Sequence, residues 1–150
     1  MSAIITFDDS LWPLLILSGQ GAPTDQQMKE YQARVRGYLE RGEKYVTISD
    51  LSQLGMLSPT QRRMQAEFLE EHAAAMRERL LGNATIVRST PIRLALQLIL
   101  PFKPLAFPYA VVADMDEAVR YALRRLEESG FGDAAERIRQ QLEVRASHLG

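Results

Sequence analysis

The feature that most constrains this fold is the alternation of short, β-branched apolar runs with longer segments whose apolar residues recur at helical spacing. Strands separated by helices of ten or more residues usually pair in parallel, through right-handed crossovers. A turn at Asp8-Asp9-Ser10 predicts that the first two strands form an antiparallel pair. The sequence therefore predicts an α/β fold: a five-stranded mixed, mostly parallel sheet with packed helices. Its strands are expected at 3–7, 12–17, 45–49, 84–88 and 108–113.

Capping signals predict where the helices begin. Thr24 with Gln27, and Ser58 with Gln61, match the capping box, in which two side chains satisfy backbone N–H groups at a helix start. Pro59 follows Ser58 at the first helical position, which favours a helix there. The expected helices span 24–41, 58–81, 90–100 and 114–130, and an extra C-terminal helix is expected at about 133–147.

Length and charge restrict the classes of protein. A chain of 150 residues suits a single domain, here with a core at about 3–128. The net charge of −1 disfavours nucleic-acid binding. No apolar run approaches the roughly 20 residues of a membrane span, and the start of the chain lacks the basic region of a secretory signal. A cytoplasmic location is therefore expected.

The composition also argues against most catalytic and cofactor chemistry. Without cysteine, the chain has no disulfide, thiol nucleophile or thiolate metal site. His72 and His148 do not have metal-ligand spacing, so no metal is expected. Neither GxGxxG nor GxxxxGK[ST] is present, and no cofactor is predicted. Ser52, His72 and Asp50 are the residue types of a catalytic triad, but no GxSxG motif accompanies them, and the chain is predicted not to be an enzyme.

The order of the elements and three short motifs resemble the STAS and SpoIIAA-like family of sulphate-transporter and anti-sigma-factor-antagonist domains. The motifs are YVTISDLS at 45–52, LSPT at 57–60, and PFKP at 101–104 with the strand and DMDEAV segment that follow. The resemblance implies a bacterial, non-enzymatic regulatory module with a protein partner, and places Ser58 where antagonists carry a phosphorylatable serine. Leu57 and Pro59 replace the Asp before and the Gly after that serine, which indicates a divergent branch.

Two readings apply to the segment 50–63. In one, Ser58 is phosphorylated at a helix N-terminus near Arg62 and Arg63, and Asp50 and Ser52 contact a partner beyond the carboxyl end of a central strand. In the other, which we prefer, Ser58 only caps its helix and Asp50 with Ser52 forms a turn.

The helix at 90–100 carries a second hypothesis, in which the protein carries or senses a small apolar or anionic ligand between this helix and the sheet. Its nearly uniform apolar character favours burial in the core, with an exposed patch or pocket lid as the alternative. CRAL-TRIO lipid-transfer domains, which share the broad fold group, suggest a lipid-like ligand by analogy. The expected contacts for an anionic ligand are Arg88, Ser89, Thr90, Arg93 and Lys103.

The C-terminal segment has an apolar stripe of Ala134, Ile138 and Leu142. Such a stripe packs on its own domain or on another chain, so a homodimer through this helix is one of the predicted assemblies.

Overall fold

The strand β3 (Tyr45–Leu54) is the middle strand of the sheet. It is flanked by β2 (Leu14–Gly21) and β4 (Leu80–Ile86), and both pairings are parallel. The computed structural model describes residues 3–99 and 105–149. In it β1 (Ile4–Leu11) pairs antiparallel with β2, and β5 (Tyr109–Val112) pairs parallel with β4. The order β1-β2-β3-β4-β5 confirms the predicted mixed, mostly parallel sheet.

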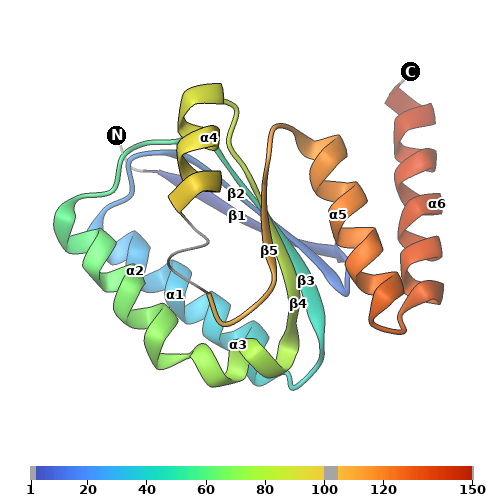
Figure 1. Cartoon of the computed structure of the whole chain (residues 1–150), viewed down its shortest axis with the longest axis horizontal. Helices are drawn as coiled ribbons and strands as arrows, with labels where there is room; N and C mark the ends of the chain where they lie inside the picture. The colour runs from blue at the N-terminus through green and yellow to red at the C-terminus, as the bar shows by residue number, and fades with distance from the viewer. Residues whose placement is uncertain (1–2, 100–104, 150) are drawn as a thin grey trace.

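Helices cover the two faces of the sheet separately (Figure 1). On one face, Leu15 and Leu17 of β2 pack against Tyr38 and Phe68 from α1 (Asp25–Glu40) and α2 (Pro59–Glu71). On the other face lies α5 (Met115–Glu128), whose buried residues pack against alternate residues of the same strands. The second cluster joins Val46, Ile48, Ala84 and Ile86 to Ala118, Ala122 and Leu126. Alternation along the strands therefore supplies two cores from one sheet.

The C-terminal helix α6 (Gly132–Leu149) packs on its own chain, beside α5 (Figure 1). Ala135 and Ile138 are fully buried in the core cluster that α5 shares, and Leu142 packs against it. Arg137 and Arg145 also reach the β1–β2 hairpin: Arg137 Nη2 donates to Trp12 O at 2.7 Å, and Arg145 Nη2 donates to Ser10 Oγ at 2.9 Å. A homodimer through α6 would therefore have to use its outer face, since the inner one is occupied.

The predicted bounds are wrong at the first hairpin and at β3. Asp8 and Ser10 belong to β1, and the chain turns at Trp12-Pro13, where proline has no N–H to donate to a ladder. β3 continues five residues beyond the predicted end at Ser49, because Gln53 and Leu54 still pair with Gln20 and Gly21 of β2. Asp50 and Ser52 thus lie within the strand and not in the loop expected there.

The predicted helix 58–81 is also wrong, since it consists of two helices. α2 ends at Glu71, and α3 (Ala73–Arg79) begins after His72, whose φ of −103° and ψ of 14° depart from helical values. The His72 ring packs on Phe68 with 4.4 Å between ring centroids. β4 follows α3 directly at Leu80, four residues earlier than predicted, because Leu80 pairs with Tyr45.

Candidate functional site

The start of α2 carries Ser58, the predicted phosphorylation site. Ser58 Oγ accepts a hydrogen bond from Gln61 N at 3.1 Å, and Ser58 N donates to Gln61 Oε1 at 3.0 Å. This reciprocal pair is the capping box expected from the sequence. Ser58, Arg62 and Arg63 are all exposed, and Arg62 Nη1 donates to Leu57 O at 2.9 Å. The hydroxyl is therefore accessible, while its role within the chain is that of a cap.

Gln61 has a second role that the sequence did not indicate. Its side chain is 5 % exposed. Its Nε2 donates to Pro23 O at 2.8 Å and to Asp25 Oδ1 at 3.0 Å, at the start of α1. One buried amide consequently holds the first turns of α1 and α2 together.

Asp50 and Ser52 contact each other but lie apart from the start of α2. Asp50 Oδ1 accepts from Ser52 N at 3.1 Å and from Ser52 Oγ at 2.5 Å, the local pattern of a side-chain turn. Asp50 is the register partner of Ile86, which packs in the core under α5. Paired residues share a sheet face, so Asp50 points to the α5 side, opposite the face covered by α2. The predicted contact residues are therefore divided between two faces.

The predicted anion contacts lie at the start of α4 (Thr90–Ile99). Arg93 donates from Nη1 to Val87 O at 3.1 Å and from Nη2 to Thr90 Oγ1 at 3.5 Å, and Ser89 Oγ accepts from Ile92 N at 3.5 Å. Arg88 is exposed. Lys103 lies outside the described residues. In the described part, Arg93 and Ser89 thus serve the start of their own helix, and the anion site stays a prediction.

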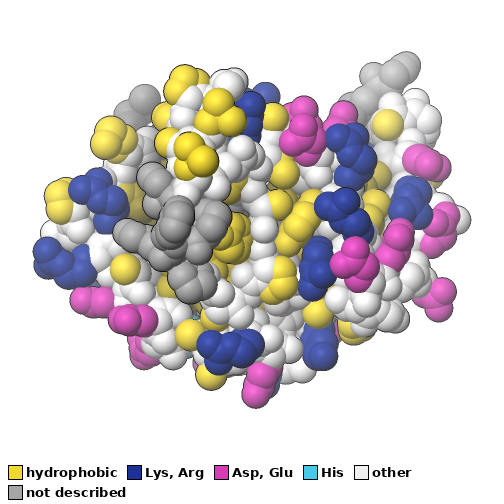
Figure 2. Space-filling model, in the orientation of Figure 1, with side chains coloured by type: hydrophobic (Ala, Val, Ile, Leu, Met, Phe, Trp, Pro, Cys, Tyr) yellow, Lys and Arg dark blue, Asp and Glu magenta, His cyan; other side chains and the backbone are white. Residues whose placement is uncertain are grey.

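The preferred prediction that α4 is a core helix is wrong. Ile92, Leu94 and Leu98 are 57 %, 53 % and 73 % exposed. Figure 2 shows hydrophobic side chains on the surface where Figure 1 places α4. The helix contacts the edge strand β5, where Gln97 Nε2 donates to Val111 O at 3.0 Å. Composition could not reveal this exposure, because an apolar helix on a sheet edge has the same residues as a buried one.

Other exposed hydrophobic residues lie at the same end of the sheet. Ile4 pairs with Gln20 at the end of β2, Leu51 is in the second half of β3, and Met56 follows β3 and is 87 % exposed. The carboxyl ends of the parallel strands all lie at one end of the sheet, and α4 begins after β4 at that same end. We call these six residues the apolar end: Ile4, Leu51, Met56, Ile92, Leu94 and Leu98.

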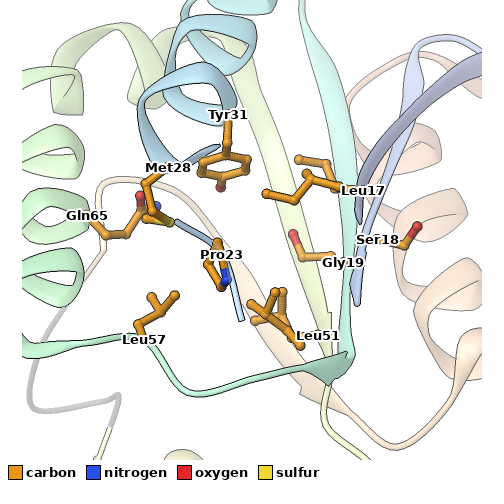
Figure 3. A pocket seen from close by; sticks show the side chains of 12 residues that line it. Leu17, Ser18, Gly19, Pro23, Met28, Tyr31, Leu51, Leu57 and Gln65 are labelled. Atoms are coloured by element: carbon orange, nitrogen blue, oxygen red, sulfur yellow. The ribbon is translucent and has the colours of Figure 1, made fainter. Parts of the chain in front are cut away.

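A cavity of about 150 Å³ opens beside the apolar end, between β2, β3 and the first turns of α1 and α2. Figure 3 shows Leu17, Met28, Leu51 and Leu57 around it, with the ring of Tyr31 above and its hydroxyl directed inward. None of the lining residues comes from α4, so this is not the place where the sequence predicted a ligand. Sequence reasoning missed it because its walls come from segments between residues 5 and 65 that meet only in the fold.

A row of polar side chains on β3 and β4 runs from the wall of this cavity. Ser49, which lines the cavity, donates to Asn83 Oδ1 at 3.0 Å, and Thr47 donates to the same atom at 2.7 Å. Asn83 Nδ2 donates to Thr85 Oγ1 at 2.8 Å. The sequence does carry a signal for this row, since Thr47 and Ser49 alternate with Val46 and Ile48 in a central strand. Its side chains satisfy one another, which is a structural role.

Burial perturbs the hydroxyl in the cavity. Desolvation by burial raises the pKa of Tyr31 above its usual value. A hydrogen bond with the Gln65 side chain lowers this pKa, but by less than burial raises it. Tyr31 therefore remains a neutral hydrogen-bond donor in this apolar surrounding. Within residues 3–99 and 105–149, no three His, Asp or Glu side chains are grouped as a metal site. None of the helices in the described part of the chain combines the length and apolar composition needed to cross a membrane.

No protein-family model matches the chain, and a search of curated proteins finds no matching relative. Solved structures do match. An uncharacterised protein of the DUF3478 family with a SpoIIAA-like fold, from Shewanella loihica, superposes with a TM-score of 0.63 at 14 % identity, over 81 % of this chain and 94 % of that one. An anti-sigma factor antagonist from Mycobacterium paratuberculosis gives a TM-score of 0.51 at 16 % identity, again over 81 % and 94 %.

The anti-sigma factor antagonist SpoIIAA in its unphosphorylated form gives a TM-score of 0.50 at 13 % identity, over 79 % of this chain and 96 % of that one. At such identities the likeness concerns the arrangement of strands and helices. The structure from Shewanella loihica is itself described as having a SpoIIAA-like fold, and it covers most of the five-stranded sheet and its helices. The chain therefore has the SpoIIAA-like fold that its element order resembles.

Proposed function

We propose that this chain is a non-enzymatic regulatory module of a bacterial cytoplasm, which binds a protein partner through its apolar end. The observation that carries the proposal is the exposure of two residues of the apolar end: Met56 is 87 % exposed and Leu98 is 73 % exposed. Exposed apolar side chains gathered at one end of a soluble protein are typical of interaction sites. Arg62 and Arg63, exposed beside Met56, would add a polar rim to such a contact.

The solved structures with this fold support a regulatory role. Two of them are anti-sigma factor antagonists, proteins whose name describes action on another protein. The hydroxyls of the two predicted site serines both make hydrogen bonds within the chain. Ser58 caps α2, and Ser52 donates to Asp50. Because Asp50 points to the α5 side, we place the partner contact at the apolar end, most of which lies in 51–63 and α4, rather than at 50–63.

The test compares exposed hydrophobic residues at the two ends of the molecule. Met56→Gln and Leu98→Gln alter the apolar end, and Val144→Gln alters an exposed residue of α6, 55 % exposed, as the matched control. Proteins cross-linked to the wild type in the source bacterium are identified by mass spectrometry, and the purified partner is titrated. We expect Met56→Gln or Leu98→Gln to weaken binding at least tenfold, and Val144→Gln to leave it within twofold. Equal binding by all four proteins would refute the proposed surface.

Phosphorylation of Ser58 is the control that we propose for this contact. A phosphate there would sit at a helix N-terminus, with Arg62 and Arg63 one turn away. Aspartate is also a good N-cap, so Ser58→Asp adds charge while keeping the helix start. We expect Ser58→Asp to change partner affinity at least fivefold and Ser58→Ala to bind like the wild type. If both variants bind unchanged, Ser58 is not a switch, whereas the apolar-end contact is unaffected by that result.

A further inference from the structure

The cavity beside the apolar end has the size and the lining of a small-molecule site. Its volume of about 150 Å³ equals that of engineered apolar cavities that bind benzene. Eight of its lining residues are Leu, Ile, Met, Pro or Tyr: Ile5, Leu17, Pro23, Met28, Tyr31, Leu51, Leu54 and Leu57. A compact apolar group of six or so heavy atoms would therefore lose its hydration shell on entry and gain close contacts.

The lining contains no charged side chain, and this decides the charge of the ligand. A carboxylate or ammonium placed there would lose hydration without a counter-ion, which costs far more than the apolar contacts return. The cavity is thus suited to a neutral molecule. It is also separate from the predicted anion contacts at the start of α4, none of which lines it.

The polar groups of the lining favour a ligand with one hydrogen-bond acceptor. Ser49 Oγ is already used as a donor to Asn83, and Gln65 Oε1 accepts from Gln32 Nε2 at 3.2 Å. The Tyr31 hydroxyl is directed into the cavity (Figure 3). Its oxygen accepts a hydrogen bond from the Gln65 side chain, which leaves its O–H available to donate. A phenol hydroxyl donates one hydrogen bond and is well matched to a carbonyl, ether or hydroxyl oxygen. Phe7 packs on the Tyr31 ring, with 5.9 Å between centroids, and holds it in place.

We propose that this cavity is a binding site for a small, neutral, largely apolar molecule whose single oxygen acceptor receives a hydrogen bond from Tyr31. The same chemistry is offered by a compact molecule such as a cyclic ketone and by the neutral end of an aliphatic chain. This site goes beyond the proposed partner contact and does not depend on it.

The experiment uses the methionines of the chain as reporters. Met28 lines the cavity, and Met56 is exposed outside it, so methyl-labelled methionine gives a reporter and an internal control in one spectrum. Cyclohexanone, benzene and 1-octanol are titrated separately into the 150-residue protein. We expect cyclohexanone to shift the Met28 methyl resonance saturably and to leave Met56 in place. A larger affinity for octanol would indicate a chain-like natural ligand. Absence of any saturable Met28 shift with all three probes would overturn the proposal.

Two pairs of variants separate the cavity from its surroundings. Leu57→Trp fills the space, whereas Met56→Trp places the same ring on the neighbouring exposed position. We expect the first to reduce cyclohexanone affinity at least tenfold and the second to leave it within twofold. Tyr31→Phe should weaken cyclohexanone about three- to tenfold and leave benzene unchanged. Its control is Tyr38→Phe, whose hydroxyl bonds Asp9 outside the cavity. Wild-type affinity in Leu57→Trp contradicts the site, and equal losses for both probes in Tyr31→Phe contradict the hydrogen bond.

Discussion

Tyr45 shows how a single residue couples the fold to pH. It begins β3, is 2 % exposed, and stacks on Trp12 with 5.0 Å between ring centroids. Burial raises its pKa from the ordinary value of 10.0 to about 12, with smaller contributions from neighbouring Tyr31 and Tyr38 opposed by Arg79. The pKa of the folded state lies above that of the unfolded state. The contribution of the neutral Tyr45 phenol to the free energy of unfolding is therefore complete below pH 10 and is lost as the pH rises toward 12.

Tyr45→Phe is expected to keep the ring stacking and remove the titrating group. Its free energy of unfolding at pH 7 should be close to that of the wild type. Between pH 9.5 and pH 11.5 the wild type should lose roughly 1–2 kcal/mol more than the variant, because only the wild type exposes a phenol on unfolding that ionises in this pH range and so stabilises the unfolded state. Urea denaturation at the two pH values measures this difference. Parallel losses in the two proteins would show that Tyr45 does not titrate as described.

At the scale of elements, the starts of α1 and α2 depend on two glutamines with similar bonding. Gln61 caps α2 and bonds Pro23 and Asp25, and Gln27 caps α1 and bonds Ala3 through both its Oε1 and its Nε2. The difference is burial, since Gln61 is almost fully buried and Gln27 is half-buried. A polar partner left behind in the interior costs more than one that water can reach.

Gln61→Leu should therefore destabilise the fold by about 2–4 kcal/mol, because Ser58 N, Pro23 O and Asp25 Oδ1 each lose a partner. Gln27→Leu is the matched control, with an expected loss of about 1 kcal/mol, since water can replace its bonds. Urea unfolding midpoints compare the two variants. A smaller loss for Gln61→Leu than for Gln27→Leu would mean that the bridge between α1 and α2 contributes little.

Close packing between β4 and α5 allows a second prediction about elements. A Cβ added at Gly82 would lie 3.0 Å from the Tyr121 hydroxyl oxygen and 3.1 Å from Arg125 Cγ. Arg125 Nε also donates to Leu81 O at 2.9 Å, and this hydrogen bond holds the Arg125 side chain against β4 next to Gly82. Gly82→Val should lower the free energy of unfolding by about 1–3 kcal/mol, and Gly82→Ala by less than about 1 kcal/mol. Equal stability of the Val variant and the wild type would show that α5 can move away from the strand.

Local signals explain which elements the sequence could predict. The capping boxes at Thr24 and Ser58 involve residues three positions apart, and both occur in the structure as expected. The break at His72 has no local signal, because three alanines follow it and favour a continuous helix. The exposure of α4 and the cavity were not predictable for a related reason: both depend on which distant segments cover an apolar surface. Strand register separates Asp50 and Ser52, two of the five predicted partner contacts, from the start of α2, and the loop predicted at Asp50 gave no sign of this separation.

At the scale of the whole molecule, α6 is integrated into the core rather than appended to it. Ile138 is fully buried in the cluster that contains Leu11 and Leu14 of the first hairpin and Leu126 of α5. Ile138→Ala should destabilise the protein by about 2–4 kcal/mol, through lost burial and a cavity. Val144→Ala, on the exposed outer face of the same helix, should change stability by less than about 0.5 kcal/mol. Thermal unfolding followed by circular dichroism should show one transition for each variant, and an early, separate melting of α6 would contradict its integration.

The bonds from Arg137 and Arg145 to the first hairpin join the beginning of the chain to its last helix. During synthesis the hairpin emerges from the ribosome more than a hundred residues before those arginines do. One side of the growing sheet, with Leu14, Val46 and Ile48, has no cover over that interval, because α5 and α6 follow all five strands in the sequence. A nascent chain of this kind exposes apolar surface until those two helices have emerged, and such exposure is the condition under which growing chains aggregate or need chaperones.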